Sequence, residues 1–211
     1  GDWDSYAAIH EFPIEEYEKA KSEILVEGYC DTAIVTLSRT AAEGSALSMD
    51  LDGDGSTVNG TTYLELDDNE RNLMKFCKEN FKHTIVLLNT SSAMEIGFLD
   101  SEEYNVEACL WIGHPGDAGL VGVGKLITGA VNPSGRLVDT WAYDLSTNPT
   151  FYNIDNNRYA NGQDADNNTF YQYEEGIYVG YRFFETADAE GYFDSPAFTG
   201  HAFKNGTAAG Y

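Results

Sequence analysis

The chain has 211 residues, of which 12 are Lys or Arg and 35 are Asp or Glu, so its formal net charge is −23. This acidic balance repels phosphate backbones and anionic lipid, which argues against nucleic-acid binding and membrane contact, whereas a neutral substrate such as a sugar is compatible with it. Hydrophobic residues make up 42% of the chain, a composition typical of a globular protein.

Helix and strand patterns alternate from the start of the chain. Residues 13–27 open with a proline followed by acidic residues and run to a glycine, which predicts a helix. Residues 31–39 are a short apolar run rich in β-branched residues, typical of a buried strand. Residues 66–81 predict a second helix, which Asp67 or Asp68 can cap. The apolar residues spaced to share one face of this helix are Leu73, Phe76, Cys77 and Phe81.

Two more strands and a helix complete this alternation. Residues 83–90 and 106–114 read as buried strands, and residues 117–130 read as a helix. Strands that are apolar throughout and alternate with helices favour parallel pairing, with helices on both faces of the sheet. The fold class predicted for residues 1–148 is therefore α/β, a doubly wound and mostly parallel sandwich of flavodoxin-like architecture.

The composition and periodicity of the sequence change after Pro149. Residues 153–169 are rich in Asn and Asp and have no periodicity, and residues 170–186 are aromatic and β-prone. We expect residues 149–211 to form an irregular extension that packs on the sandwich and on neighbouring domains absent from this chain.

The cysteines give no metal or redox pattern. Cys30, Cys77 and Cys109 are an odd number, and none has the spacing of a zinc or dithiol site. Cys77 and Cys109 lie in apolar patterns and are expected to be buried thiols. No metal and no cofactor is predicted. The compartment stays open, with the cytoplasm of a bacterium favoured over secretion.

Functional loops of a parallel α/β sheet follow the carboxyl ends of its strands. The loop after residue 39 carries Glu43 among small residues, which is suitable for presenting a carboxyl group to a substrate. Asp50 and Asp52 lie further along it and match the opening of an EF-hand calcium loop, but the twelfth position is Thr61 rather than Glu. A solvated acidic turn is therefore favoured, while a calcium site of another type stays open.

Several strings resemble a known family in their order along the chain. These strings are "AIVTLSRTAAEG", "YLELDDNERNLMKFCKENFKHTIVLLNTSSAMEIG", "VEACLWIGHPGDAG", "GAVNPSGRLVDTWAYD" and "YEEGIYVGYRFFET". Over residues 30–186 the chain resembles the α/β-sandwich domain of family 3 glycoside hydrolases, the β-glucosidase group. The strings at residues 132–140 and 175–186 are the most specific.

The resemblance implies a division of catalytic labour between two domains. Family members use a retaining mechanism in which a (β/α)8 barrel supplies an Asp nucleophile and the sandwich supplies the acid/base Glu. The family string resembles S-R-x-x-G-E-G-x-D-R, so Glu43 takes the acid/base position and Arg39, Asp50 and Asp52 are expected to bind substrate. The chain departs from this pattern at Ala42, where the family has Gly, and at residues 46–47, where it has Asp-Arg.

The function implied is that of an exo-acting β-glucosidase domain acting on terminal β-D-glucosyl residues of oligosaccharides or aryl glucosides. The chain resembles a fragment of an enzyme with permuted domain order, inactive alone because the barrel is missing. A β-xylosidase, an exo-β-glucanase and a non-catalytic carbohydrate-binding or scaffold sandwich are the alternatives. A flavin-binding protein is disfavoured because no phosphate-binding glycine loop follows a strand.

Overall fold

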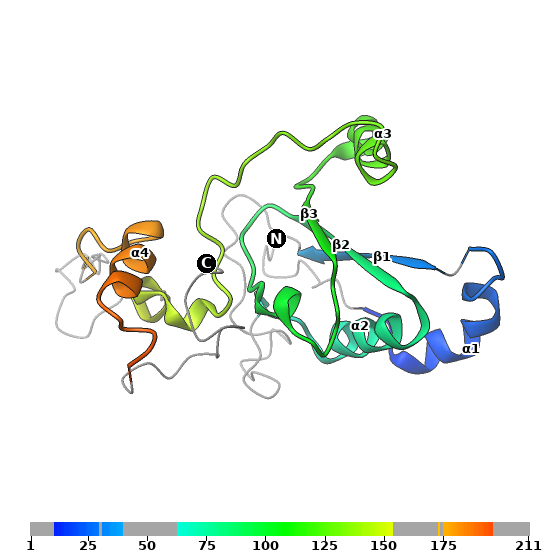
Figure 1. Cartoon of the computed structure of the whole chain (residues 1–211), viewed down its shortest axis with the longest axis horizontal. Helices are drawn as coiled ribbons and strands as arrows, with labels where there is room; N and C mark the ends of the chain where they lie inside the picture. The colour runs from blue at the N-terminus through cyan, green and yellow to red at the C-terminus, as the bar shows by residue number, and fades with distance from the viewer. Residues whose placement is uncertain (1–10, 30, 40–62, 154–172, 174, 196–211) are drawn as a thin grey trace, which may run out of the picture. The chain divides into compact units, whose positions relative to one another are not determined.

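A computed structural model describes residues 11–29, 31–39, 63–153, 173 and 175–195. The chain forms two compact units, Gly1–Arg136 and Leu137–Tyr211 (Figure 1). The packing of residues 149–211 on neighbouring domains stays a prediction.

The first unit contains a parallel three-stranded sheet. Its strands are β1 (Thr32–Arg39), β2 (His83–Thr90) and β3 (Ala108–Trp111), in the spatial order β1-β2-β3 (Figure 1). Arg39 pairs with Thr90 in the register, so the carboxyl ends of β1 and β2 lie side by side. The predicted α/β class is confirmed, and β3 is shorter than its pattern indicated.

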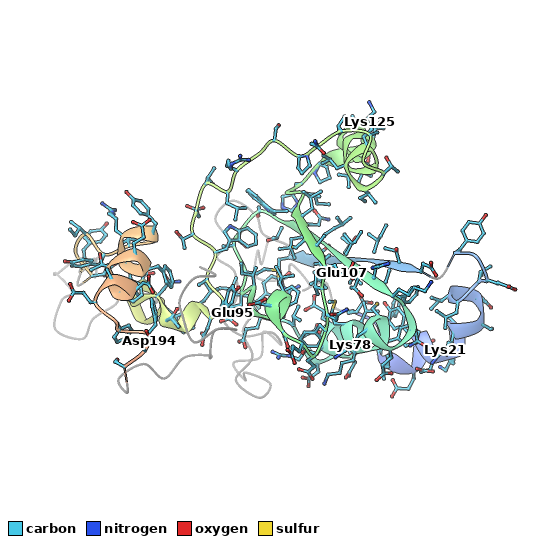
Figure 2. All side chains as sticks on the ribbon, in the orientation of Figure 1. Lys21, Lys78, Glu95, Glu107, Lys125 and Asp194 are labelled. Atoms are coloured by element: carbon cyan, nitrogen blue, oxygen red, sulfur yellow. The ribbon has the colours of Figure 1, made fainter. Side chains whose placement is uncertain are left out.

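The predicted helices are confirmed with slightly different ends. They are α1 (Ile14–Ile24), α2 (Asp68–Asn80) and α3 (Gly116–Ile127). Tyr17 of α1 lies against Phe76 of α2, with 5.9 Å between the ring centroids. Lys78, labelled in Figure 2, is exposed on α2 and donates a hydrogen bond to the carbonyl oxygen of Glu102.

One face of the sheet and the inner face of α2 make the core of the first unit. Its members on the two long strands and on α2 are Ala33, Val35, Leu37, Val86, Leu88, Leu73, Met74, Phe76 and Cys77. Three of the four residues predicted to share a face of α2 are thus buried. The opposite face of β1 is open, since Ile34 is 49% exposed.

Cys109 corrects one sequence prediction. The apolar run around it indicated a buried thiol, but Cys109 is exposed in the structure. It lies on β3, which among the described residues pairs with β2 alone and is there an edge strand. Periodicity indicates that a strand has an apolar face, but it does not say whether a further element covers that face.

The second unit corrects another prediction. The aromatic stretch 170–186 reads as β-prone, but its described end forms helix α4 (Tyr181–Ala189) after Gly180, which has φ of +60°. Phe184 and Ala187, three residues apart, face inward on α4 as a helical period requires. Short 3-10 turns at Leu145–Thr147 and Pro149–Asn153 precede this helix. The core of this unit consists of Ala142, Phe184, Ala187 and Phe193.

Candidate functional site

The residues predicted to act on substrate fall mainly outside the described part of the chain. Glu43, Asp50 and Asp52 belong to residues 40–62, about whose placement the structure says nothing. Their catalytic and binding roles stay predictions. Arg39 and Tyr63, which flank this segment, are described.

The first end is held by a buried guanidinium group. Arg39, the last residue of β1, is 3% exposed. Its Nε donates to the carbonyl oxygen of Tyr63 at 2.6 Å, and its Nη2 donates to the carbonyl oxygen of Glu65 at 2.5 Å. Its Nη1 donates to the carbonyl oxygen of Ser38 at 2.8 Å. One side chain therefore bonds to the backbone on both sides of residues 40–62.

The charge of Arg39 is balanced by a carboxylate on α2. Glu70 is 4% exposed, and its Oε1 and Oε2 accept from Nη1 and Nη2 of Arg39 at 2.6 and 2.8 Å. Two parallel hydrogen bonds between these planar groups fix the orientation of both side chains. This bidentate pair is buried, so water does not compete for its bonds.

Glu70 also belongs to the start of α2. The backbone N–H of Asp67 donates to Oε2 of Glu70 at 2.9 Å, and the N–H of Glu70 donates to Oδ1 of Asp67 at 2.7 Å. This reciprocal arrangement is a capping box. The Glu70 carboxylate consequently joins the helix start to Arg39 and, through Arg39, to the end of β1.

Substrate binding by Arg39 stays a prediction. All three nitrogens of its guanidinium group already bond to protein oxygens. In the described part of the chain its contacts are those of an anchor between β1, the stretch at residues 63–65 and α2.

Polar groups of β2 and β3 lie near the carboxyl ends of these strands, as Arg39 does on β1. The indole Nε1 of Trp111 donates to the carbonyl oxygen of Thr90 at 2.7 Å, which ties the ends of these two strands. Oδ1 of Asn89 is buried and has no hydrogen-bond partner among the described residues. Asn89 is the last residue but one of β2 and pairs in the register with Ser38 of β1. Its unused acceptor therefore lies close to the carboxyl ends of both strands.

Sequence reasoning missed Glu70 and Asn89. The Asp67-x-x-Glu70 spacing is a capping-box signature and could have identified Glu70 as the side chain that bonds back to the Asp67 backbone at the helix start. Its pairing with Arg39 joins residues 31 positions apart and has no local signal. Asn89 lies inside an apolar run, where a single amide gives no indication of its surroundings.

The other candidates remain separate from this anchor. His114 is exposed after β3.

No group of three or more His, Cys, Asp or Glu side chains able to hold a metal ion occurs among the described residues. Within the same residues, every helix is too short or too polar to cross a membrane. A shallow hollow in the second unit is lined by mainly apolar groups, together with Glu175 and Glu190.

Comparison with known proteins identifies the family. Residues 16–181 match the glycosyl hydrolase family 3 C-terminal domain. A β-glucosidase of Ruminococcus albus is 34% identical over 156 residues, which cover 74% of this chain and 14% of that enzyme. The first three curated relatives are matched over only 14%, 19% and 23% of their length.

Solved structures agree with the sequence comparison. The β-glucosidase of Paenibacillus barengoltzii is 25% identical, with a TM-score of 0.58 over 83% of this chain and 16% of its own. β-Glucosidase 3B of Thermotoga neapolitana, in complex with glucose, is 31% identical, with a TM-score of 0.55 over 74% of this chain and 20% of its own. The resemblance stated from the sequence is confirmed, and the chain belongs to the C-terminal domain family of glycoside hydrolase family 3.

Proposed function

We propose that this chain is the acid/base-bearing domain of a retaining, exo-acting β-glucosidase. The proposed substrates are oligosaccharides and aryl glucosides with a terminal β-D-glucosyl residue. The observation that carries the proposal is the string S-R-x-x-x-E-G in a family 3 domain, in which Glu43 follows four positions after Arg39, the last residue of β1. The carboxyl ends of parallel strands are where α/β sheets carry their functional loops.

The proposed first step requires Glu43 in its protonated form. An Asp of the barrel domain attacks the anomeric carbon, the glycosidic C–O bond breaks, and the Glu43 carboxyl group gives its proton to the departing oxygen. A glycosyl–enzyme ester and a free alcohol or phenol result. Burial between two domains would raise the pKa of the acid by desolvation, which favours the protonated form.

The proposed second step uses the same residue as a base. The Glu43 carboxylate takes a proton from water, and the oxygen of that water attacks the anomeric carbon and displaces the barrel Asp. Two inversions give a product with retained configuration, and both carboxyl groups return to their starting states. This mechanism needs the two groups about 5 Å apart across the sugar.

The barrel domain of the same enzyme is the proposed partner. The chain spans 14–23% of the length of the first three curated relatives, and the proposal assigns the nucleophile to a barrel in the remaining part of the enzyme. The 211-residue chain alone is therefore expected to bind glucosides weakly and to show no turnover. Exposed aromatic side chains of residues 173–192 are the surface proposed to contact neighbouring domains.

The test uses Glu43→Ala in the full-length enzyme and two glucosides. With an alkyl β-glucoside, whose leaving group needs a proton, we expect kcat/KM to fall by about 100- to 10,000-fold. With a dinitrophenyl β-glucoside, cleavage of the glycosidic bond should be nearly unaffected. Equal rates of variant and native enzyme on both substrates would refute the proposal and favour a non-catalytic sandwich. Aryl β-xylosides, assayed in parallel, distinguish glucosidase from xylosidase activity.

A further inference from the structure

We infer that Arg39 and Glu70 are positioning residues for the general acid/base, since together they fix the two ends of the chain segment that contains Glu43. This inference rests on the proposed function. It concerns neither the nucleophile nor the sugar contacts, and it follows from bonds among described residues.

The side chain of Arg39 joins the end of β1 to a part of the chain 24 positions later. Its Nε donates at 2.6 Å to the carbonyl oxygen of Tyr63, and Glu43 lies between these two residues in the sequence. A second bond, to Glu65, prevents rotation about the first. The two ends are thereby held together by one rigid planar group.

Glu70 fixes this group to the rest of the unit. Its carboxylate holds Nη1 and Nη2 at 2.6 and 2.8 Å and also accepts from the N–H of Asp67 at the start of α2. The position of the guanidinium plane is therefore determined by a helix that itself packs on the sheet. Glu43 is only four positions from Arg39, so a displaced guanidinium would shift the carboxyl group that must reach the leaving oxygen.

Stability alone is a weak reason for such a pair. A buried ion pair loses the hydration of two charges, and well-packed apolar residues of similar size are often equally or more stabilising. A pair that binds three backbone carbonyl groups and the N–H of a helix cap fixes a geometry that apolar side chains cannot fix. Misplacing a reacting group by about 1 Å can cost on the order of 100-fold in rate.

Lysine provides a discriminating variant at position 39. Arg39→Lys keeps the positive charge but replaces five fixed N–H groups by one ammonium, which cannot reach Tyr63, Glu65 and both Glu70 oxygens together. If Arg39 only balanced the charge of Glu70, the Arg39→Lys variant would keep the native activity. If it positions the segment, lysine will not.

The experiment is carried out on the full-length enzyme with four variants. They are Arg39→Lys, the double variant Arg39→Met/Glu70→Leu, Glu43→Ala and the control Lys75→Gln. The double variant leaves no unpaired buried charge, so it remains informative if the single variant does not fold. The control removes the exposed Lys75–Glu103 ion pair, 2.9 Å long, from the same helix. For each variant, kcat/KM is measured on an alkyl and on a dinitrophenyl β-glucoside.

We expect Arg39→Lys and the double variant to lose about 10- to 100-fold on the alkyl glucoside, and less than about 3-fold on the dinitrophenyl glucoside. A smaller folded fraction lowers both rates equally, so only misplacement of the acid changes their ratio. Lys75→Gln should match the native enzyme on both substrates. Equal losses on the two substrates, or no loss on either, would overturn the inference.

The same data separate this inference from the proposed function. If Glu43→Ala loses activity selectively on the alkyl glucoside and the Arg39 variants do not, the positioning role is wrong and the acid/base assignment stands. If Glu43→Ala shows no selectivity, the proposed function fails, and the positioning role fails with it.

Discussion

Arg39 is an unusual end for a buried strand. The alternation along β1 places Arg39 on the same face as Ala33, Val35 and Leu37, so its position implies burial. A buried cation requires an anion and several acceptors, and Glu70 with the backbone carbonyl groups of Ser38, Tyr63 and Glu65 supplies them. Its inward position could be predicted from period two alone, but its partners come from residues far along the chain.

The buried thiol of Cys77 makes the free energy of unfolding dependent on pH in the alkaline range. Burial raises the pKa of the Cys77 thiol from its ordinary value of 9.0 to about 11, and the negative charge of Glu11 acts in the same direction. Between these values the unfolded chain has lost the thiol proton while the folded chain retains it. The free energy of unfolding should therefore be unaffected by this thiol below pH 9 and fall as the pH rises from 9 to 11.

Urea unfolding of the 211-residue chain across this pH range measures the effect. Cys77→Ala lowers the stability at every pH because it leaves a cavity, but its pH dependence should be flatter than that of the native sequence. All other titrating groups are common to both chains and cancel in the difference. Parallel curves for the two chains would contradict a raised pKa at Cys77.

Helix α2 depends on its capping box. Asp67→Ala removes the acceptor of the Glu70 N–H, 2.7 Å away, and we expect it to lower the free energy of unfolding by about 1 kcal/mol. Thermal unfolding followed by circular dichroism measures this loss. Asp68→Ala is the matched control, since Asp68 lies in the first turn and interacts with the helix dipole without capping. Equal losses in the two variants would show that the capping bond has no special weight.

The elements of the first unit were largely predictable because their patterns are local. The β-branched runs of β1 and β2 and the apolar face of α2 each lie within one short window. Helix α4 was missed because aromatic content favours strands, and the Phe184–Ala187 spacing is too short a signal to reverse it. The exposure of Cys109 depends on what lies beside β3, which no local window records.

The candidate site was predictable only in part, for a related reason. A family string points to Glu43, and the role of this residue stays a prediction because residues 40–62 lie outside the described structure. The anchor formed by Arg39 and Glu70 appears only when residues 31 positions apart are brought together by the fold. Sequence therefore indicates which residue could do the chemistry, and structure indicates what could hold it in place.

A retaining glycosidase needs two carboxyl groups, and the proposal assigns this chain one of them. The chain covers 14%, 19% and 23% of the first three curated relatives, so the nucleophile is expected on a part of the enzyme outside this chain. Such an arrangement makes activity a property of the assembled domains. The two groups also act on opposite faces of the sugar. When azide rescues a variant that lacks one of them, the configuration of the glucosyl azide therefore identifies whether the acid/base or the nucleophile has been removed.

The most direct measurement is azide rescue of Glu43→Ala in the full-length enzyme, with dinitrophenyl β-glucoside as substrate. Without its base, the variant accumulates the glycosyl–enzyme ester, and azide, which needs no deprotonation, displaces the barrel carboxylate. We expect turnover to rise with azide concentration and the product, identified by NMR, to be β-glucosyl azide. An α-glucosyl azide would instead identify Glu43 as the nucleophile. Native rates without azide and no azide product would show that Glu43 takes no part in the chemistry.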